Sequence, residues 1–375
     1  MFRSKSIFVL AMASCLLLAA RAPGKEPFRT VVFRSGTAGY HTFRIPSLIT
    51  THKGTLLAFS EGRKAGGGDH GDIDLVLKRS TDNGTTWSDM QIVYEEGGEK
   101  KVTIGNPCPV IDEATGTIWL TFCRDNQDVL VTHSQDDGAT WAKPRDISSD
   151  VTKPAWTWVA TGPGIGIQLR IGKHKSRLVI PCDHGVPMGG KRVMISHVFY
   201  SDDAGKSWQL GGSLDIHTDE CQVVELNDGT LMINARNYWG RNGNRPEWGH
   251  QRAISTSKDG GATWSKLMFD KHLIEPICQA SFIRYDQTGD HGPNLLLFSN
   301  PASTTSRSQM TVRVSRDDGK SWPTSRLLHQ GPAAYSCLAV LADGPIGCLF
   351  EAGDKSAYET LTFTRFSLEW LQGND

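Results

Sequence analysis

The chain has 375 residues, and its 40 lysines and arginines are balanced by 40 aspartates and glutamates. Length alone suggests about two domains of ~150 residues each. The balanced charge excludes a general polyanion-binding protein, so an anionic ligand would have to be held by a local cluster of arginines.

The first residues predict a secretory signal rather than a part of the fold. Arg3 and Lys5 precede an apolar run, Ile7 to Ala20, which is shorter than the roughly 20 residues that a membrane-spanning helix needs. We therefore expect residues 1–22 to be a signal peptide and the protein to be secreted or periplasmic, or lysosomal in a eukaryote. A buried N-terminal helix and a lipoprotein-type cleavage at Cys15 are the alternatives. No later segment is apolar enough to span a membrane.

Farther along the chain, five segments share the eight-residue pattern S-x-D-x-G-x-[ST]-W. This Asp box has the chemistry of a hairpin turn, because its Asp accepts backbone N–H groups and its Gly supplies a positive φ. The closing Trp is expected to pack against the next hairpin. The boxes start 54, 67, 56 and 58 residues apart, at Ser80, Ser134, Ser201, Ser257 and Ser315.

This spacing leaves room for four short strands per unit, which is the size of a propeller blade. The sequence thus predicts an all-β fold, a six-bladed β-propeller of four-stranded antiparallel blades with Asp-box hairpin turns. It would form a single domain over residues 28–372. Residues 74–77 and 310–314 have the alternation of strands. The last strand, around residues 357–368, is expected to pair with the first strands and close the ring.

Metal and nucleotide sites are not supported by the spacing. A calcium loop needs a glutamate at its twelfth position, where three of the boxes have Val93, Ile147 and Leu328. The glycine-rich stretch 162–166 is not followed by the helical pattern of a dinucleotide loop. The seven cysteines after the signal segment are widely spaced and form no C-x-x-C pair, which predicts buried thiols rather than a disulfide scaffold or a zinc site. No cofactor and no metal is expected.

The segments between the boxes carry a second pattern, which bears on function. In chain order they read FRIP (43–46), AFSEGR (58–63), GGD (67–69), DECQ (219–222), NARN (234–237), FSNP (298–301), AYS (334–336) and LFE (349–351). Their order and spacing over nearly the whole mature chain resemble the sialidases, or neuraminidases. The pattern is most similar to the compact, single-domain enzymes of glycoside hydrolase family 33 and their animal relatives.

The resemblance implies roles for nine side chains of a single catalytic domain. Tyr335 would be the nucleophile, Glu220 its base, and Asp69 the acid/base. The full set comprises the catalytic residues Asp69, Glu220 and Tyr335, the substrate-binding residues Arg44, Arg236, Arg307 and Arg63, and the supporting residues Glu351 and Glu61.

These residue types suit the chemistry of sialic acid, whose anomeric carbon bears a carboxylate. Converging arginines can hold that carboxylate, and a nearby glutamate would offset their charge. A carboxylate nucleophile would be repelled by the substrate, whereas a neutral phenol is not. Because the ordinary pKa of tyrosine is about 10, Tyr335 would need a base beside it. The resemblance therefore implies an exo-α-sialidase that hydrolyses terminal α-linked sialic acids of glycoconjugates with retention of configuration.

Several neighbours and functions remain as alternatives. Asp72 and Asp74 are expected to be loop and strand-edge hydrogen bonders, and strand alternation places Glu225 on the opposite face from Glu220. Arg313 and Arg316 compete with Arg307. The segments 156–158 and 238–248 could line the pocket or belong to the core.

The alternative functions are a non-catalytic sialoside-binding propeller, a trans-sialidase, elimination to an anhydro product, or a related ulosonic-acid hydrolase. The expected partner is a sialylated glycoconjugate, with no nucleic acid and no stable membrane span.

Overall fold

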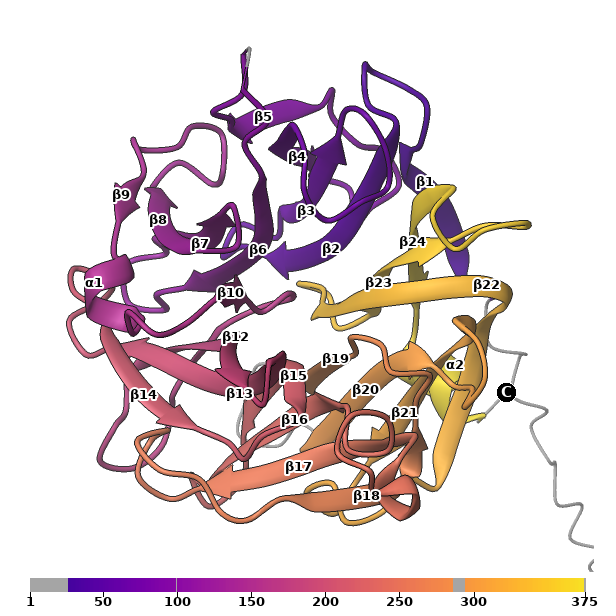
Figure 1. Ribbon diagram of the computed structural model, residues 1–375. Coiled ribbons are helices and arrows are strands. Elements are labelled where there is room, and N and C mark those ends of the chain that lie inside the picture. Colours follow the sequence, from indigo (N-terminus) through magenta and orange to yellow (C-terminus); the bar gives the residue numbers. More distant parts are fainter. Residues whose placement is uncertain (1–25, 99, 286–293, 374–375) are drawn as a thin grey trace, which may run out of the picture.

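The computed structural model describes residues 26–98, 100–285 and 294–373, and the predicted signal peptide lies outside them. The described chain is an all-β protein whose sheets stand around a central axis in a β-propeller arrangement (Figure 1). Within it, no helix has the length and hydropathy needed to cross a membrane. The short helices are α1 (Ser148–Val151), the 3-10 helix η1 (Pro246–Trp248) and α2 (Leu368–Gln372).

Four antiparallel sheets follow one another along the chain, each with its first strand near the axis and its last strand at the rim (Figure 1). The first contains β2 (Thr42–Thr50), β3 (Leu56–Arg63), β4 (Ile73–Ser80) and β5 (Gln91–Tyr94). The second contains β6 (Ile104–Ile111), β7 (Ile118–Arg124), β8 (Asp128–Ser134) and β9 (Arg145–Asp146). The third contains β10 (Trp158–Thr161), β11 (Ile167–Gln168), β12 (Leu178–Met188), β13 (Lys191–Ser201) and β14 (Gln209–Ser213). The fourth contains β15 (Thr218–Glu225), β16 (Leu231–Asn237), β17 (Gln251–Ser257) and β18 (Met268–Ile274).

The remaining strands form one seven-stranded sheet in which the two ends of the chain meet. β24 pairs antiparallel with β1, with Phe28 opposite Arg365 and Arg34 opposite Thr360. The prediction that the last strand closes the ring on the first is therefore confirmed. The sheet contains β19 (Ser281–Tyr285), β20 (Leu295–Pro301), β21 (Ser308–Ser315), β22 (Thr324–Val340), β23 (Ile346–Ala352), β24 (Thr360–Phe366) and β1 (Phe28–Arg34).

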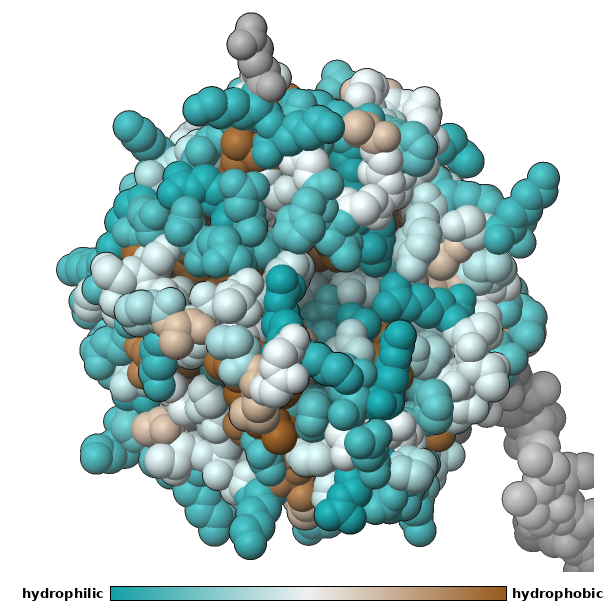
Figure 2. All heavy atoms as spheres, in the orientation of Figure 1, coloured by the Kyte–Doolittle hydropathy of each residue, from teal (hydrophilic) through white to brown (hydrophobic). Residues whose placement is uncertain are grey.

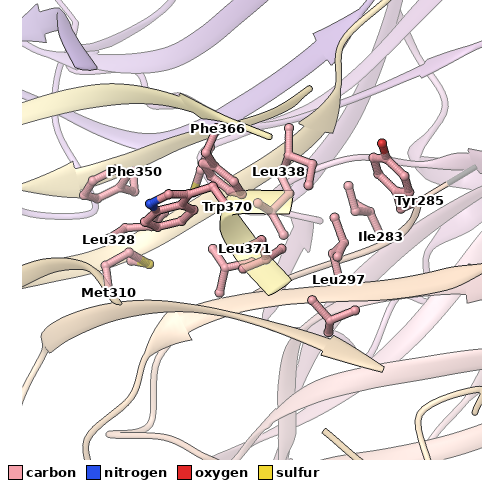
Figure 3. Close-up of a cluster of buried hydrophobic side chains, with 14 of the residues drawn as sticks. Ile283, Tyr285, Leu297, Met310, Leu328, Leu338, Phe350, Phe366, Trp370 and Leu371 are labelled. Carbon is pink, nitrogen blue, oxygen red and sulfur yellow. The ribbon is translucent and has the colours of Figure 1, made fainter. Parts of the chain in front are cut away.

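The helix α2 completes the core of this closing sheet. Ser367 caps its first turn, because its hydroxyl accepts the Trp370 N–H at 3.1 Å. The indole of Trp370 and the side chain of Leu371 then pack among Leu328, Phe350 and Phe366 (Figure 3). Burial of these large apolar groups anchors the C-terminal segment to the ring that β24 closes.

The Asp boxes form the predicted turns. In the second box the Asp136 carboxylate accepts the Thr140 N–H at 2.9 Å and the Thr140 hydroxyl at 2.6 Å. The Ser134 hydroxyl accepts the Gly138 N–H at 2.9 Å, and Gly138 has a φ of +75°. In each of the four consecutive sheets a box joins the last two strands, and the fifth box joins β21 and β22 of the closing sheet. The first box begins at Ser80, at the opposite end of β4 from Ile73, which pairs with Arg63.

The box tryptophans point the other way from the prediction, toward the preceding sheet rather than the next hairpin. Trp141 packs edge-on against Phe59 of β3, with the ring centroids 5.7 Å apart. Trp264 donates its indole N–H to the Gly212 carbonyl of β14 at 3.2 Å. The reason is that the turn itself lies against the preceding sheet, as the contact between Gly138 and Leu57 shows. Each box is thus a link between adjacent sheets.

The glycine-rich stretch 162–166 fills the axis instead of binding a nucleotide. Gln222 and Gln279 donate to the Pro163 carbonyl at 3.2 and 3.1 Å. The Ser47 hydroxyl donates to the Gly164 carbonyl at 2.8 Å, and Ile165 packs against the core of several sheets. The segment therefore presents carbonyls to side chains of three sheets. The seven cysteines predicted to be buried thiols are free and buried.

We predict that Gly205→Ala lowers the free energy of unfolding by about 1–3 kcal/mol, in the range measured for overpacking. Gly205 has a φ of +85°, and an added Cβ would lie 2.2 Å from the Trp119 indole of the preceding sheet. The matched control is Gly172→Ala, where φ is +73° but no heavy atom lies within 4 Å of the added Cβ. Urea unfolding followed by circular dichroism measures both. Equal losses would mean that the contact between box and sheet contributes nothing.

Candidate active site

A cavity of about 420 Å³ opens on the axis, at the end where β2 and β15 begin and β3 and β16 end. Figure 2 shows the corresponding hollow, surrounded mainly by hydrophilic residues. Six of the nine predicted site residues line the cavity, namely Glu61, Arg63, Asp69, Glu220, Arg236 and Tyr335. The other three contact residues of this lining: Arg44 donates to Asp69, Glu351 accepts the Tyr335 N–H, and Arg307 lies over the Tyr335 ring.

Three of the predicted substrate-binding arginines, Arg44, Arg236 and Arg307, gather around one phenol ring. The guanidinium carbons of Arg44 and Arg307 lie 5.0 and 5.5 Å from the centroid of the Tyr335 ring. A terminal nitrogen of Arg236 donates to the Tyr335 hydroxyl at 3.1 Å. Because these arginines come from β2, β16 and the turn before β21, the convergence depends on the assembly of separate sheets.

A completely buried carboxylate, Glu351 of β23, joins the first arginine to the tyrosine. It accepts two nitrogens of Arg44 at 3.0 and 3.4 Å. It also accepts the backbone N–H groups of Ile45 and Tyr335, at 3.1 and 3.0 Å. Ile45 has a φ of +60°, unusual for a β-branched residue, at the bulge that interrupts β2. Glu351 thus satisfies the bulge and offsets the positive charge of Arg44.

Glu61 pairs with Arg63 in the same way that Glu351 pairs with Arg44. One of its oxygens accepts two Arg63 nitrogens at 2.9 and 2.7 Å, and the other accepts the Asn106 N–H at 2.9 Å. Arg63 is 2% exposed and still reaches the cavity, where it donates to Asp69 at 2.9 Å. The structure therefore places Glu61 as the group that orients Arg63, as the sequence indicates.

Tyr335 and Glu220 form a direct pair at the cavity wall. The phenol hydroxyl donates to one oxygen of Glu220, and the other oxygen accepts Arg236 at 2.7 Å. Burial, reinforced by the negative charge of Glu220, raises the pKa of Tyr335 well above its usual value. The phenol is therefore neutral in the folded protein, and Glu220 is the group positioned to accept its proton.

Asp69 lies in the loop between β3 and β4, and 63% of its side chain is exposed. Its carboxylate is 3.4 Å from Arg44 and 2.9 Å from Arg63. Partial burial raises its pKa, but the two guanidinium charges outweigh this effect and hold the pKa below the ordinary aspartate value. In the ligand-free protein Asp69 is therefore an ionised, solvent-accessible carboxylate at the mouth of the arginine cluster.

The competing acidic residues have other partners. Lys64 holds Asp72 at 2.9 Å and Asp74 at 3.0 Å, which confirms their hydrogen-bonding roles in the loop and strand edge. Glu225 accepts the N–H groups of Arg170 and Ile171 and lines a different cavity, at the opposite end of the inner strands. Glu225 and Glu220 thus lie toward opposite ends of β15 and line different cavities.

The two competing arginines and the aromatic segment 156–158 also have defined places in the structure. Arg313 donates to Asn300 at 3.3 Å, and Arg316 is an exposed residue of the fifth box. Trp158 lines the cavity. Trp156 instead stacks on His184 with the ring centroids 3.7 Å apart, so the segment 156–158 contributes to both cavity and core.

Sequence reasoning missed Tyr358, which contacts two of the arginines. Tyr358 accepts Arg307 at 2.9 Å, and its ring lies 4.4 Å from the guanidinium carbon of Arg44. Of the segment 238–248, which could line the pocket or belong to the core, Tyr238 lines the cavity. Tyr238 accepts Arg236 at 2.7 Å. Tyr358 follows Glu351 by seven residues in a loop, a position that the sequence marks only by its closeness to a predicted site residue. Sequence reasoning also missed Asp183 of the cavity wall, and it included Asp219 only as a member of the DECQ segment without a role.

Comparison with known proteins agrees with this geometry. The sequence profile of the BNR repeat-like domain matches residues 54–348. The sialidase of Micromonospora viridifaciens is 35% identical over 94% of this chain and 56% of its own length. The sialidase of Bacteroides fragilis is 33% identical over 86% of this chain and 62% of its own length, so the chain spans about three fifths of these two relatives. The exo-alpha-sialidase of Aspergillus fumigatus is 32% identical over 89% of this chain and 86% of its own length.

Solved structures give the same result. The Hadza microbial sialidase Hz136 has a TM-score of 0.81 at 31% identity, covering 92% of this chain and 69% of that one. A leech intramolecular trans-sialidase, 20% identical with a TM-score of 0.75, shares the fold. From the profile match over most of the chain and the relatives of 30% identity or more, the chain belongs to the sialidase family.

Proposed function

We propose that the chain is an exo-α-sialidase, a glycoside hydrolase that removes terminal α-linked sialic acids from glycoproteins, glycolipids and oligosaccharides. The observation that carries this proposal is the Tyr335–Glu220 hydrogen bond inside a cluster of three arginines. A site that only bound a sugar acid would need the arginines, but it would not need a base beside a buried phenol.

Binding begins with the substrate carboxylate and the arginines Arg44, Arg236 and Arg307. Planar guanidinium groups give charge-assisted, partly bidentate hydrogen bonds to a carboxylate. Glu351 keeps Arg44 in place before the substrate arrives, so little ordering of that side chain remains to be done. Arg63, held by Glu61, is a secondary contact to the sugar.

The covalent step uses the neutral phenol. Glu220 takes the proton as the Tyr335 oxygen forms a bond to the anomeric carbon, while the bond from that carbon to the leaving oxygen breaks. Asp69 donates a proton to the leaving oxygen and afterwards takes one from the water that releases the sugar. Two displacements at the same carbon give net retention of configuration.

Asp69 must carry a proton to act as the acid, although its pKa is held low in the ligand-free protein. A substrate carboxylate bound to Arg44 would add a negative charge next to Asp69 and cancel part of the effect of the guanidinium groups. Binding of the substrate would therefore raise the pKa of Asp69 and favour the protonated form that acts as the acid. The enzyme should work best at acidic pH.

We also propose that the chain forms a single six-bladed propeller that is exported from the cytoplasm. We count six blades, because the first part of β22 pairs with β21 and its last part with β23, so that one strand can serve two four-stranded units. Residues 28–372 then form one catalytic propeller. Secretion or export to the periplasm follows from the predicted signal peptide of residues 1–22, which gives the enzyme access to sialylated glycoconjugates.

We predict that Tyr335→Phe lowers kcat for a fluorogenic sialoside by at least 100-fold, as expected when a covalent nucleophile is removed. The matched control is Tyr94→Phe, which also breaks a Tyr–Glu hydrogen bond, of 2.6 Å to Glu96, but away from the cavity. It should leave kcat unchanged. Proton NMR of the first product formed by the wild type tests for retention. Release of no sialic acid would refute the enzyme proposal, and an anhydro or transferred product would identify a different reaction.

Arg307→Ala should cost about 2–4 kcal/mol in kcat/KM, the range for a buried, charged hydrogen-bonding partner. Arg313→Ala is the control, because Arg313 lies nearby in the sequence but contacts Asn300, whereas Arg307 contacts Tyr358 and lies over the Tyr335 ring. Steady-state kinetics of both variants decide between the two arginines. A larger loss for the Arg313 variant would reverse the assignment.

The pH profile tests the role of Asp69. The alkaline limb of kcat/KM reports the free enzyme, where the guanidinium groups hold the pKa of Asp69 low. The alkaline limb of kcat reports the substrate complex, where that pKa is higher. We therefore expect the kcat limb at the higher pH, and Asp69→Asn should strongly reduce kcat. Coincident limbs would show that substrate binding does not protonate Asp69.

A further inference from the structure

Two carboxyl groups of the cavity wall have no part in the proposed chemistry. Asp183 of β12 has no exposed surface, and Asp219 of β15 is 6% exposed. The Trp158 indole donates to one oxygen of Asp183 at 3.0 Å. For the other oxygen, the described part of the chain provides no N–H or O–H donor. A buried carboxylate oxygen without a donor is costly and requires an explanation.

The explanation lies in the neighbouring carboxyl group. The side chains of Asp183 and Asp219 are within hydrogen-bonding reach of each other. Two ionised carboxylates in such contact repel, whereas an acid and a carboxylate form a strong hydrogen bond. Burial, followed by the charges of Asp219 and Glu220, raises the pKa of Asp183 well above its usual value. Burial also raises the pKa of Asp219 to about 6, against the opposing charge of Arg236.

We propose that Asp183 and Asp219 share one proton, and that the single negative charge of the pair positions the Arg236 guanidinium against Glu220 and Tyr335. An Asp219 oxygen lies 3.6 Å from the Nε of Arg236, which has no other partner among the described residues. The terminal nitrogen Nη1 of Arg236 then donates to Glu220 and Tyr335, and Nη2 donates to Tyr238. Asp183 and Asp219 are positioning residues, and the inference rests on the proposed function of the same site.

Apart from Arg236 and Glu220, the titratable groups near Asp183 and Asp219 are neutral. Arg236 of β16 is the cation beside the pair, and Glu220 is a further anion on the same strand as Asp219. Tyr238 and three cysteine thiols face the pair, and burial raises the pKa of each, so they are neutral. His184 adjoins Asp183, but it pairs with His197, and burial lowers the pKa of both. The thiols belong to Cys123, Cys182 and Cys221.

The shared proton has a consequence for Arg236. Two full negative charges beside its Nε would compete with Glu220 for the same guanidinium group. With one charge, the guanidinium is held from one side by Asp219 and from the other by Glu220. The neutral acid also removes the repulsion between Asp183 and Asp219 in a wall with little access to water.

Infrared spectroscopy of the ligand-free protein tests the shared proton without relying on activity. We expect the C=O stretch of a buried neutral carboxylic acid near neutral pH in the wild type, and its loss in Asp183→Asn and in Asp219→Asn. Glu225→Gln is the matched control. Glu225 is buried in the same strand as Asp219, but two N–H donors satisfy its carboxylate, so the band should remain. A band that persists in both aspartate variants would overturn the proposal, whatever reaction the enzyme catalyses.

Kinetics test the positioning role. Asp183→Leu should lower kcat/KM at least tenfold, because it leaves Asp219 without its donor. Asp183→Asn should recover most of this loss, because its amide can donate the same hydrogen bond. Glu225→Gln should match the wild type. Equal kcat/KM values for the Leu and Asn variants would overturn the donor role. If Asp183→Leu does not fold, Asp219→Asn takes its place with the same expected loss, and a wild-type value there would refute the positioning of Arg236.

Discussion

The site depends first on the burial of one carboxylate, Glu351. A carboxylate without exposed surface persists in a folded protein only when donors surround it. Its donors are the Arg44 side chain and the N–H groups of Ile45 and Tyr335. The same hydrogen bonds fix Arg44, the bulge at Ile45 and the backbone of Tyr335 relative to one another. Since β2 and β23 lie at opposite ends of the chain, the site is complete only when the ring has closed.

The same arrangement recurs elsewhere in the propeller. A buried glutamate accepts an arginine and also a backbone N–H that a bulge or a strand end leaves unpaired. One group thus resolves two problems, an unsatisfied donor and an unbalanced cation. Breaking such a pair is strongly unfavourable, so the pairs act as rigid supports. The three sets are Glu61 with Arg63 and Asn106, Glu275 with Arg252 and Asn237, and Glu351 with Arg44 and Ile45.

The features that sequence analysis predicted well are local, or belong to motifs of fixed order. The turn of an Asp box needs only the residues of the box, so Asp136 and Gly138 could be assigned directly. The direction of Trp141 could not, because it depends on how adjacent sheets pack. Likewise, Asp183 stands 36 residues before Asp219 in a segment without any motif. Only the packing of β12 beside β15 brings the two carboxyl groups together.

The carboxylates of the site fall into two kinds, and the difference lies in their exposure. Glu351 and Glu61 are 0% and 3% exposed and form parts of strands, so an incoming anion cannot displace them. The Asp69 side chain is 63% exposed on a loop, and its ion pairs with Arg44 and Arg63 are accessible to water. Asp69 is therefore the carboxylate of the cluster most accessible to an incoming anion, whereas Glu351, Glu61 and the buried Glu220 hold Arg44, Arg63 and Arg236 from within the fold. In the proposed chemistry a substrate carboxylate would replace the exposed charge of Asp69, and Asp69 is also the group that this chemistry must protonate.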